Sequence, residues 1–266
     1  QIEGGGFGRF CSSTYIGANS FGGGRGFADG IYLTGEENGN VGRFWALDTA
    51  TGGFWSLPGL GRAGWENATL IDTGSPNTVG VLLMDDNNAP IYLWVGEKSS
   101  APGANFLERN GLAASQGSLY TWAPSGGSIG TGEGTLGVPD SADLNKLALG
   151  TAAAGSWQRL GSGTEVAALS GSELKDLAFS KGALQLLRLE DVHVNPANGQ
   201  QAVFATTGGS GADVFGNLIT LDFAGAFDGT GRIGVGNSTA LKVIYDADRL
   251  AVPASGIRSP DNLTWT

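Results

Sequence analysis

The sequence predicts an all-β, β-propeller-like fold that carries a partly helical insertion. Short apolar runs recur about every 10–14 residues, a spacing typical of sandwiches, barrels and propellers. Gly, Asn, Asp or Pro separates these runs, as expected of turns between strands. The 266 residues include 47 Gly, far above the usual ~7%, but 41% of the chain is apolar and seven residues are Trp. Such a chain forms turns readily and still buries a core.

The first part of the chain predicts short strands joined by turns. Residues 1–30 are Gly-rich around Phe10–Tyr15, and the strand rhythm begins after them. Period-two alternation and β-branched or aromatic residues favour strands at the runs that follow. These runs are 31–34, 43–48, 53–57, 66–71, 78–84 and 91–95.

Residues 97–183 differ in composition and predict an insertion lying across the β body. Tyr120–Trp122 favours a strand, and a loop rich in Gly, Ser and Thr follows at 125–137. One helix is expected from Ser141 to Leu149. A second is expected to begin near Ser170, where the residues that follow offer capping and helical period.

After residue 184 the strand rhythm returns, with runs at 186–194, 201–207, 217–223 and 240–245. We therefore predict a single propeller-like domain over 1–266. Residues 259–266 have the pattern of an opening strand, and the chain begins at Gln1 without Met. Both features predict that the natural protein is processed and continues further.

The charge and the cysteine content restrict the class of partner. A net charge of −10 and a pI near 4.5 disfavour nucleic acid and anionic membranes and suit cations. No apolar run reaches the roughly 18 residues of a membrane span. The single cysteine, Cys11, forms no intrachain disulfide. Sequons at Asn67, Asn237 and Asn262 permit glycosylation if the protein is exported.

Two motif matches lack the context that their chemistry needs. Gly132–Gly137 fits GxGxxG, but no strand precedes it and Pro139 follows it, so dinucleotide binding is disfavoured. The only histidine, His193, would have to serve any Ser-His-Asp triad, and no nucleophile-elbow motif accompanies it.

Acidic side chains gather at expected strand ends and turns. They are Glu36–Glu37, Glu66, Asp85–Asp86 and Asp261. A β scaffold collects such side chains at one rim, where carboxylates repel one another unless a cation lies between them. Each alone is better explained as a solvated turn acid. Taken together, they make a metal site an equally good explanation.

The apolar stretch 185–196 carries Arg188 and Glu190 two residues apart. In a strand they would share a face. The pair has two interpretations: a surface ion pair, or an oxyanion clamp beside a metal ligand, since the guanidinium fork fits phosphate.

Several segments together resemble the PhoX-type alkaline phosphatases, which are calcium- and iron-dependent phosphatases on a β-propeller. They occur in the family's order and span nearly the whole chain. The segments are Gly8–Ser13, Ile31–Glu37, Leu60–Asn67, Met84–Asp86, Trp94–Lys98, Arg188–Asp191, Phe204–Thr207 and Ser259–Asn262.

The resemblance implies a site and an activity. Cys11 matches an iron ligand, and Arg188 matches an arginine that grips the substrate phosphate. The carboxylates that match ligands of calcium and iron are Glu37, Glu66, Asp86, Glu190 and Asp261. The implied protein is an exported phosphomonoesterase, extracellular or periplasmic, acting on a phosphate monoester or another small anion.

Two alternatives stay open. The Gly-rich ends and the sequons also suit a calcium-stabilised extracellular structural or adhesive protein that self-assembles, for example into a fibre. The Trp content would fit sugar binding on exposed aromatic rings.

Overall fold

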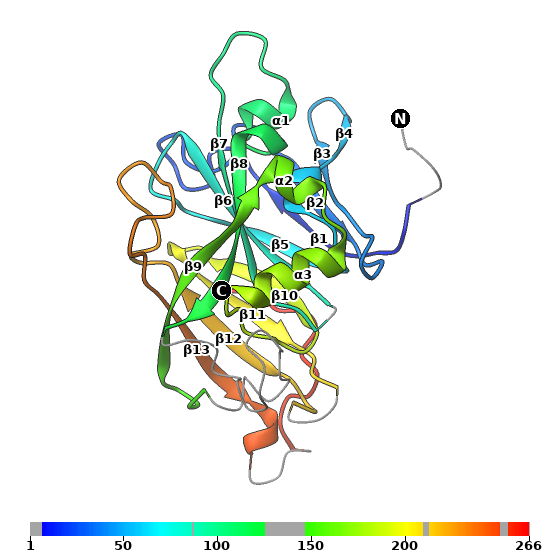
Figure 1. Ribbon diagram of the computed structural model, residues 1–266, viewed down its shortest axis with the longest axis vertical. Helices are drawn as coiled ribbons and strands as arrows, with labels where there is room; N and C mark the ends of the chain where they lie inside the picture. The colour runs from blue at the N-terminus through cyan, green and yellow to red at the C-terminus, as the bar shows by residue number, and fades with distance from the viewer. Residues whose placement is uncertain (1–6, 87, 126–146, 210–212, 251–254, 266) are drawn as a thin grey trace.

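The computed structural model describes residues 7–86, 88–125, 147–209, 213–250 and 255–265. Their strands form two antiparallel sheets (Figure 1). The small sheet has the order β1-β2-β3-β4, and the large sheet has the order β10-β11-β12-β13-β9-β8-β7-β6-β5. The predicted all-β class is confirmed.

The strands have the following bounds. The small sheet contains β1 (Phe10–Ile16), β2 (Ile31–Glu36), β3 (Phe44–Asp48) and β4 (Phe54–Ser56). The large sheet contains β5 (Trp65–Ile71), β6 (Thr78–Asp85), β7 (Tyr92–Glu97), β8 (Gly117–Pro124), β9 (Ala152–Ser162), β10 (Leu189–Asn195), β11 (Asn198–Thr206), β12 (Asn217–Asp222) and β13 (Thr239–Asp246).

The large sheet curls until its end strands, β10 and β5, lie against each other. An isolated bridge joins Ala89, which follows β6, to Leu186, which precedes β10. At the C-terminal end of β5, the amide of Asp72 donates to the carbonyl of Gly199 in β11 over 2.8 Å. The sheet is therefore a nearly closed barrel, and residues far apart in the sequence meet at its rims.

The described residues of the segment 97–183 are not a layer laid across this sheet. They supply β8 and β9, which lie in its middle and pair with each other. They also supply α1 (Phe106–Arg109), α2 (Gly163–Ala167) and α3 (Gly171–Ser180). The described part of the chain also contains 3₁₀ turns at Pro58–Leu60, Ala114–Gln116 and Ala247–Arg249. Strand β8 contains the expected strand Tyr120–Trp122, whereas β9 was not expected from the sequence.

The two predicted helices have different outcomes. Ser170 caps α3 in a capping box with Glu173, as expected from the sequence. The helix expected from Ser141 to Leu149 lies largely outside the described residues, and 147–149 are not helical. None of the described helices is long and apolar enough to cross a membrane.

The strand expected to open at residue 259 is not formed. Residues 259–265 carry no strand assignment. They run beside β10, where the amide of Leu263 donates to Asp191 Oδ2 over 3.1 Å and that of Trp265 donates to His193 Nδ1 over 3.3 Å. These two side-chain bonds and one backbone bond, from the Asp191 amide to the Asp261 carbonyl, hold the segment beside β10 without a regular ladder.

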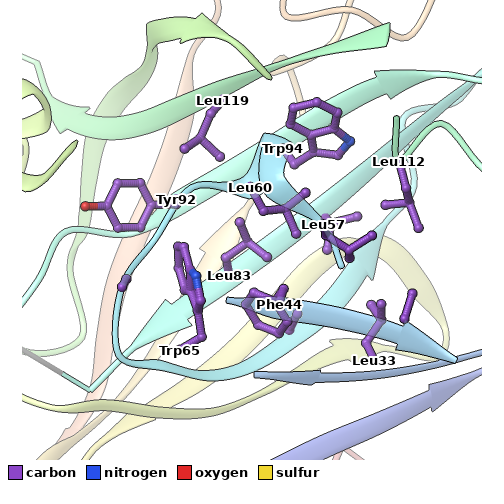
Figure 2. Close-up of a cluster of buried hydrophobic side chains, with 14 of the residues drawn as sticks. Leu33, Phe44, Leu57, Leu60, Trp65, Leu83, Tyr92, Trp94, Leu112 and Leu119 are labelled. Carbon is purple, nitrogen blue, oxygen red and sulfur yellow. The ribbon is translucent and has the colours of Figure 1, made fainter. Parts of the chain in front are cut away.

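The hydrophobic core is divided by the large sheet. One cluster lies between the small sheet and one face of β5–β8, and Figure 2 shows part of it converging around Trp65 and Trp94. The other fills the inside of the curled sheet. Strand β6 supplies both, with Val81 and Leu83 on one side and Leu82 and Met84 on the other. Burial on both faces makes this region rigid.

Trp94 is enclosed by glycine backbone. Its ring is fully buried, and its indole N–H donates to the Gly111 carbonyl over 2.8 Å. A Cβ placed on Gly117 would collide with the ring. The backbone of Gly117 is extended, at φ −154° and ψ −178°, so only the ring excludes a side chain there.

We expect Gly117→Ala to lower the free energy of unfolding by about 1–3 kcal/mol, because the added methyl overpacks the Trp94 pocket. Chemical denaturation of both proteins measures the change. Gly229→Ala is the control, since a Cβ there meets nothing within 4 Å. Equal losses in the two variants would show that the ring does not exclude a side chain.

Candidate metal and phosphate site

A pair of acidic residues lies at the end of β2, and another lies at the end of β6. In each pair one side chain is buried and accepts hydrogen bonds from the fold, and the other belongs to the candidate site. Glu36 is buried and accepts the backbone N–H groups of Gly8 and Arg43 and the indole N–H of Trp45. Asp85 is likewise buried and accepts the amide of Gly64. Because neighbouring residues of a strand point in opposite directions, Glu37 and Asp86 are turned to the other side.

Cys11, Glu37 and Glu66 come together at this rim. Each offers one ligand atom, and these atoms lie within 4.8 Å of one another. Glu37 is brought to β5 by an isolated bridge to Gly64, and its carboxylate is paired with the Arg9 guanidinium. Glu66 is only 3% exposed.

A second group of side chains surrounds the Arg188 guanidinium. Arg188 Nε lies 3.0 Å from Asp86 Oδ1, and a terminal guanidinium nitrogen lies 3.2 Å from Glu190 Oε1. The Thr207 hydroxyl donates to the same Glu190 oxygen over 2.7 Å. Glu190 is 4% exposed, whereas the Arg188 side chain is 51% exposed. Asp86 and Glu190 therefore fix the position of the guanidinium, while part of the Arg188 side chain stays open to solvent.

The backbone of Arg188 differs from the sequence expectation. The alternating pattern placed it inside a strand, but β10 begins at Leu189, and Arg188 has φ +55°. A left-handed residue of this size is uncommon and strained. Arg188 and Glu190 do reach each other, but through this bend and not through strand alternation.

Irregular strand pairing accompanies the site residues. The register of β1 shifts between Phe10 and Ser13, around Cys11. The register of β5 shifts between Trp65 and Ala68, around Glu66. That of β10 shifts between Leu189 and Val192, around Glu190. Bulges re-aim side chains next to functional sites, and these place three site residues outside the regular alternation.

The two groups form one electrostatic unit. The pKa of Glu66 is raised to about 7, first by burial and then by the charges of Glu190, Asp86 and Asp261. Burial also raises the pKa of Glu190 to about 7, with the Thr207 hydrogen bond opposing it and Asp86 adding to it. Burial, followed by the nearby Glu66, raises the pKa of the Cys11 thiol.

Asp261 reaches the cluster from the far end of the described chain. Its carbonyl accepts the Asp191 amide over 3.3 Å. The Asp191 carboxylate accepts the side-chain amide of Asn67 in β5 and the backbone amide of Leu263. Sequence reasoning missed the supporting roles of Asn67, Asp191 and Thr207, because hydrogen bonds between residues so far apart leave no local pattern.

The structure also places the remaining sequence candidates. Asn67 is buried and bonded to Asp191, which leaves no room for a glycan, so we withdraw it as a glycosylation candidate. Asn237 is half-buried and Asn262 is exposed. His193 accepts a backbone N–H of the C-terminal segment. The GxGxxG match at 132–137 lies outside the described residues.

The residues at this rim fit cations. Among the described side chains the cluster contains the carboxylates of Glu37, Glu66, Asp86, Glu190 and Asp261. Arg9 and Arg188 are the guanidinium groups paired with them. With every carboxylate ionised, negative charge exceeds positive charge in this set. Hard carboxylate oxygens suit Ca²⁺, and a thiolate beside carboxylates suits iron.

A solved structure has a similar fold. It is Pseudomonas fluorescens PhoX in complex with vanadate, a transition state analogue, and it matches with a TM-score of 0.53 at 18% sequence identity. The match covers 83% of this chain and 40% of that one, so the chain spans about two fifths of that protein's length. Neither a family model nor a curated protein matches the sequence. The likeness confirms the predicted PhoX-like, propeller-like fold, and at this identity it is a likeness of fold alone.

We expect the metal-free protein to lose stability as pH rises from about 4.5 to about 7. Glu66 and Glu190 have folded pKa values raised to about 7, so the native state binds more protons than the unfolded state in this window, and the free energy of unfolding falls with pH. The loss per carboxyl is on the order of 1–3 kcal/mol. Thermal melting at a series of pH values in chelator measures it.

Glu66→Gln is expected to flatten this pH dependence, because the amide does not titrate. Glu97→Gln, which changes an exposed carboxylate at the other end of the sheet, is the matched control and keeps the slope. A Glu66→Gln slope equal to that of the unmodified protein would contradict a raised pKa at Glu66.

Proposed function

We propose that this protein is a metal-dependent phosphomonoesterase with a PhoX-like site. The observation that carries the proposal is the position of the Arg188 guanidinium, which is half exposed and is held by Asp86 and Glu190. It lies beside a cluster of carboxylates whose negative charge exceeds the positive charge of the paired arginines. A guanidinium on its own would bind many anions. A guanidinium at the edge of a cation site favours a dianion that bridges both, and a phosphate monoester is such a dianion.

Arg188 is suited to hold the phosphoryl group. A guanidinium carries five N–H donors, and the contacts to Asp86 and Glu190 involve only two of its nitrogens. These contacts fix the plane of the fork before substrate arrives, so little side-chain freedom is lost on binding. The exposed half of the side chain gives phosphate access from solvent.

The surrounding carboxylates would hold the cations. Glu66, Asp86, Glu190 and Asp261 offer oxygens for calcium, and Cys11 with Glu37 and Glu66 offers a mixed set for iron. When bound, such cations supply Lewis-acid charge and activate an oxygen nucleophile. Binding would also displace protons, since the pKa values of Cys11, Glu66 and Glu190 are raised in the metal-free protein. Metal affinity should therefore increase with pH.

Export to the periplasm or the extracellular space belongs to the same proposal, as does glycosylation at Asn237 or Asn262. It rests on the PhoX-like fold and on the sequons. Fractionation of cells that express the natural gene product would test whether the protein is exported.

A second candidate function is that of a calcium-stabilised structural or adhesive subunit. A cluster of partly exposed aromatic rings on the small sheet favours it: Phe7, Phe10, Trp45 and Phe54 contact one another at centroid distances of 5.1–6.5 Å. Apolar surface of this kind favours association. Calcium binding together with concentration-dependent assembly and no turnover would select this candidate over the enzyme.

We expect Arg188→Ala to reduce the hydrolysis of an aryl phosphate, assayed at alkaline pH with calcium and iron supplied. The lost charge-assisted hydrogen bonds, about 1.5–3 kcal/mol each, correspond to a tenfold to hundredfold fall in kcat/KM. Arg188→Lys should recover only part of it, because a lysine lacks the planar fork. Arg159→Ala removes a guanidinium of similar exposure from another ion pair and serves as the control.

Two results would contradict this assignment in different ways. If the unmodified protein binds calcium without turnover, the phosphatase proposal fails. If Arg188→Ala and Arg159→Ala are equally active, an enzyme remains but Arg188 does not hold the phosphate.

Calcium is expected to raise the melting temperature, and chelation to lower it. A cation at ~100 times its Kd stabilises the folded state by about 2.7 kcal/mol if the unfolded chain does not bind it. Glu66→Gln should remove most of this shift, whereas Glu97→Gln should keep it. A chelator-insensitive melting temperature in the unmodified protein would contradict a cation site in this cluster.

A further inference from the structure

A cavity of about 300 Å³ lies at the end of the large sheet opposite the carboxylate cluster. Glu97, in its lining, pairs with Thr78 at the start of β6, whereas the site residue Asp86 follows the end of that strand. The length of β6 therefore separates the two places by roughly 20–25 Å. An adjoining cavity of about 460 Å³ shares Glu97 and Arg232 with the first. Neither belongs to the site described above.

Elements distant in sequence build the wall of this cavity. Glu97 ends β7, Gln116 ends the 3₁₀ turn before β8, and Tyr120 follows an irregularity in β8. Arg232 comes from the loop between β12 and β13, and its Nε lies 2.8 Å from Glu97 Oε1. Asp228 fixes this loop, because its amide donates to the Arg232 carbonyl over 2.8 Å and its carboxylate accepts the Arg232 amide over 3.2 Å. The loop thus closes one side of the barrel mouth, a common place for ligand sites.

The lining is polar and close to neutral in charge. Glu97 and Arg232 offset each other, and hydroxyl groups come from Ser115, Ser118 and Tyr120. Burial raises the pKa of Tyr120, so its hydroxyl stays protonated. Gln116 Oε1 is buried and has no hydrogen-bond partner among the described residues. A buried amide oxygen left unpaired is costly. Gln116 lines the cavity, and a turn of its side chain toward the cavity would let a ligand donate a hydrogen bond to this oxygen.

These features together select one class of ligand. An anion would meet the Glu97 carboxylate, and an apolar molecule would leave Gln116 and the hydroxyl groups unpaired. A neutral ligand with several hydroxyl groups can donate to Gln116 and Glu97 and accept from Arg232. The Tyr120 ring adds a surface for the apolar face of such a ligand.

We propose that this cavity binds a sugar ring, as one residue of a glycan, with the adjoining cavity receiving the next residue. The site is separate from the phosphoesterase proposal, and either can fail without the other. Its function would be to hold the protein on a glycosylated or polysaccharide surface.

The test is titration of the full chain with four sugars, with binding measured by calorimetry and by saturation-transfer NMR. The sugars are methyl α-glucoside, methyl α-mannoside, methyl β-galactoside and N-acetylglucosamine. We expect at least one of them to bind with a Kd of about 1 mM, the range of a single small ligand with a few hydrogen bonds. Gln116→Leu should weaken that binding by about tenfold or more. Gln158→Leu, the same change at a glutamine outside the cavity lining, should leave it unchanged.

The proposal is overturned if none of the four sugars binds, or if binding survives both Gln116→Leu and Arg232→Leu. It is also overturned if inorganic phosphate displaces the sugar, or if only Phe54→Ala abolishes binding, which would place the sugar on the exposed aromatic rings. Arg232 is exposed, so Arg232→Leu carries the test if Gln116→Leu does not fold. Circular dichroism and melting check the folding of every variant.

Discussion

Burial of carboxylates with too few cationic partners is the constraint around which this molecule is arranged. Glu66 and Glu190 are almost fully buried and lie near Asp86 and Asp261. Placing ionised carboxylates together in a protein interior costs several kcal/mol unless opposite charge compensates. Arg188 supplies part of the compensating positive charge, and protonation of Glu66 and Glu190 near neutral pH removes part of the negative charge. A bound cation would supply the rest, so folding, proton binding and cation binding are linked at this rim.

The curl of the large sheet is what creates this concentration of charge. Glu66 stands in β5 and Glu190 in β10, the two ends of the strand order. They meet only because the sheet closes on itself. The strands that support them are packed on both faces, as β6 shows, so the rim rests on a rigid base. Bulges at Cys11, Glu66 and Glu190 then turn side chains toward one point without disturbing the strands behind them.

The sequence reveals the parts of this arrangement that depend on local pattern. Acidic residues directly after the apolar runs of β2 and β6 predict Glu37 and Asp86 at a rim, and Ser170 predicts the start of α3. Other parts depend on contacts that leave no local trace. Strand β1 is mostly exposed and polar, so it lacks strand alternation. Strand β9 begins with small residues, and one of them, Gly155, lies directly against the Trp122 ring, where a side chain would collide. The left-handed bend at Arg188 likewise follows from packing and not from residue type, since arginine rarely adopts it.

Asp191 joins sheet closure to the approach of Asp261. Its carboxylate accepts from Asn67 in β5 and from Leu263 in the C-terminal segment, while its amide donates to the carbonyl of Asp261. Asp191 thus links β10 to β5 and also holds Asp261 near the other carboxylates. Because these bonds share one residue, loosening the C-terminal segment would remove a donor from the half-buried Asp191 carboxylate and a partner from its amide. A cation bound among the carboxylates would oppose that loosening, since it gains a ligand only while the segment stays in place. The C-terminal segment, the seam and the charge cluster therefore stabilise one another and should be lost together.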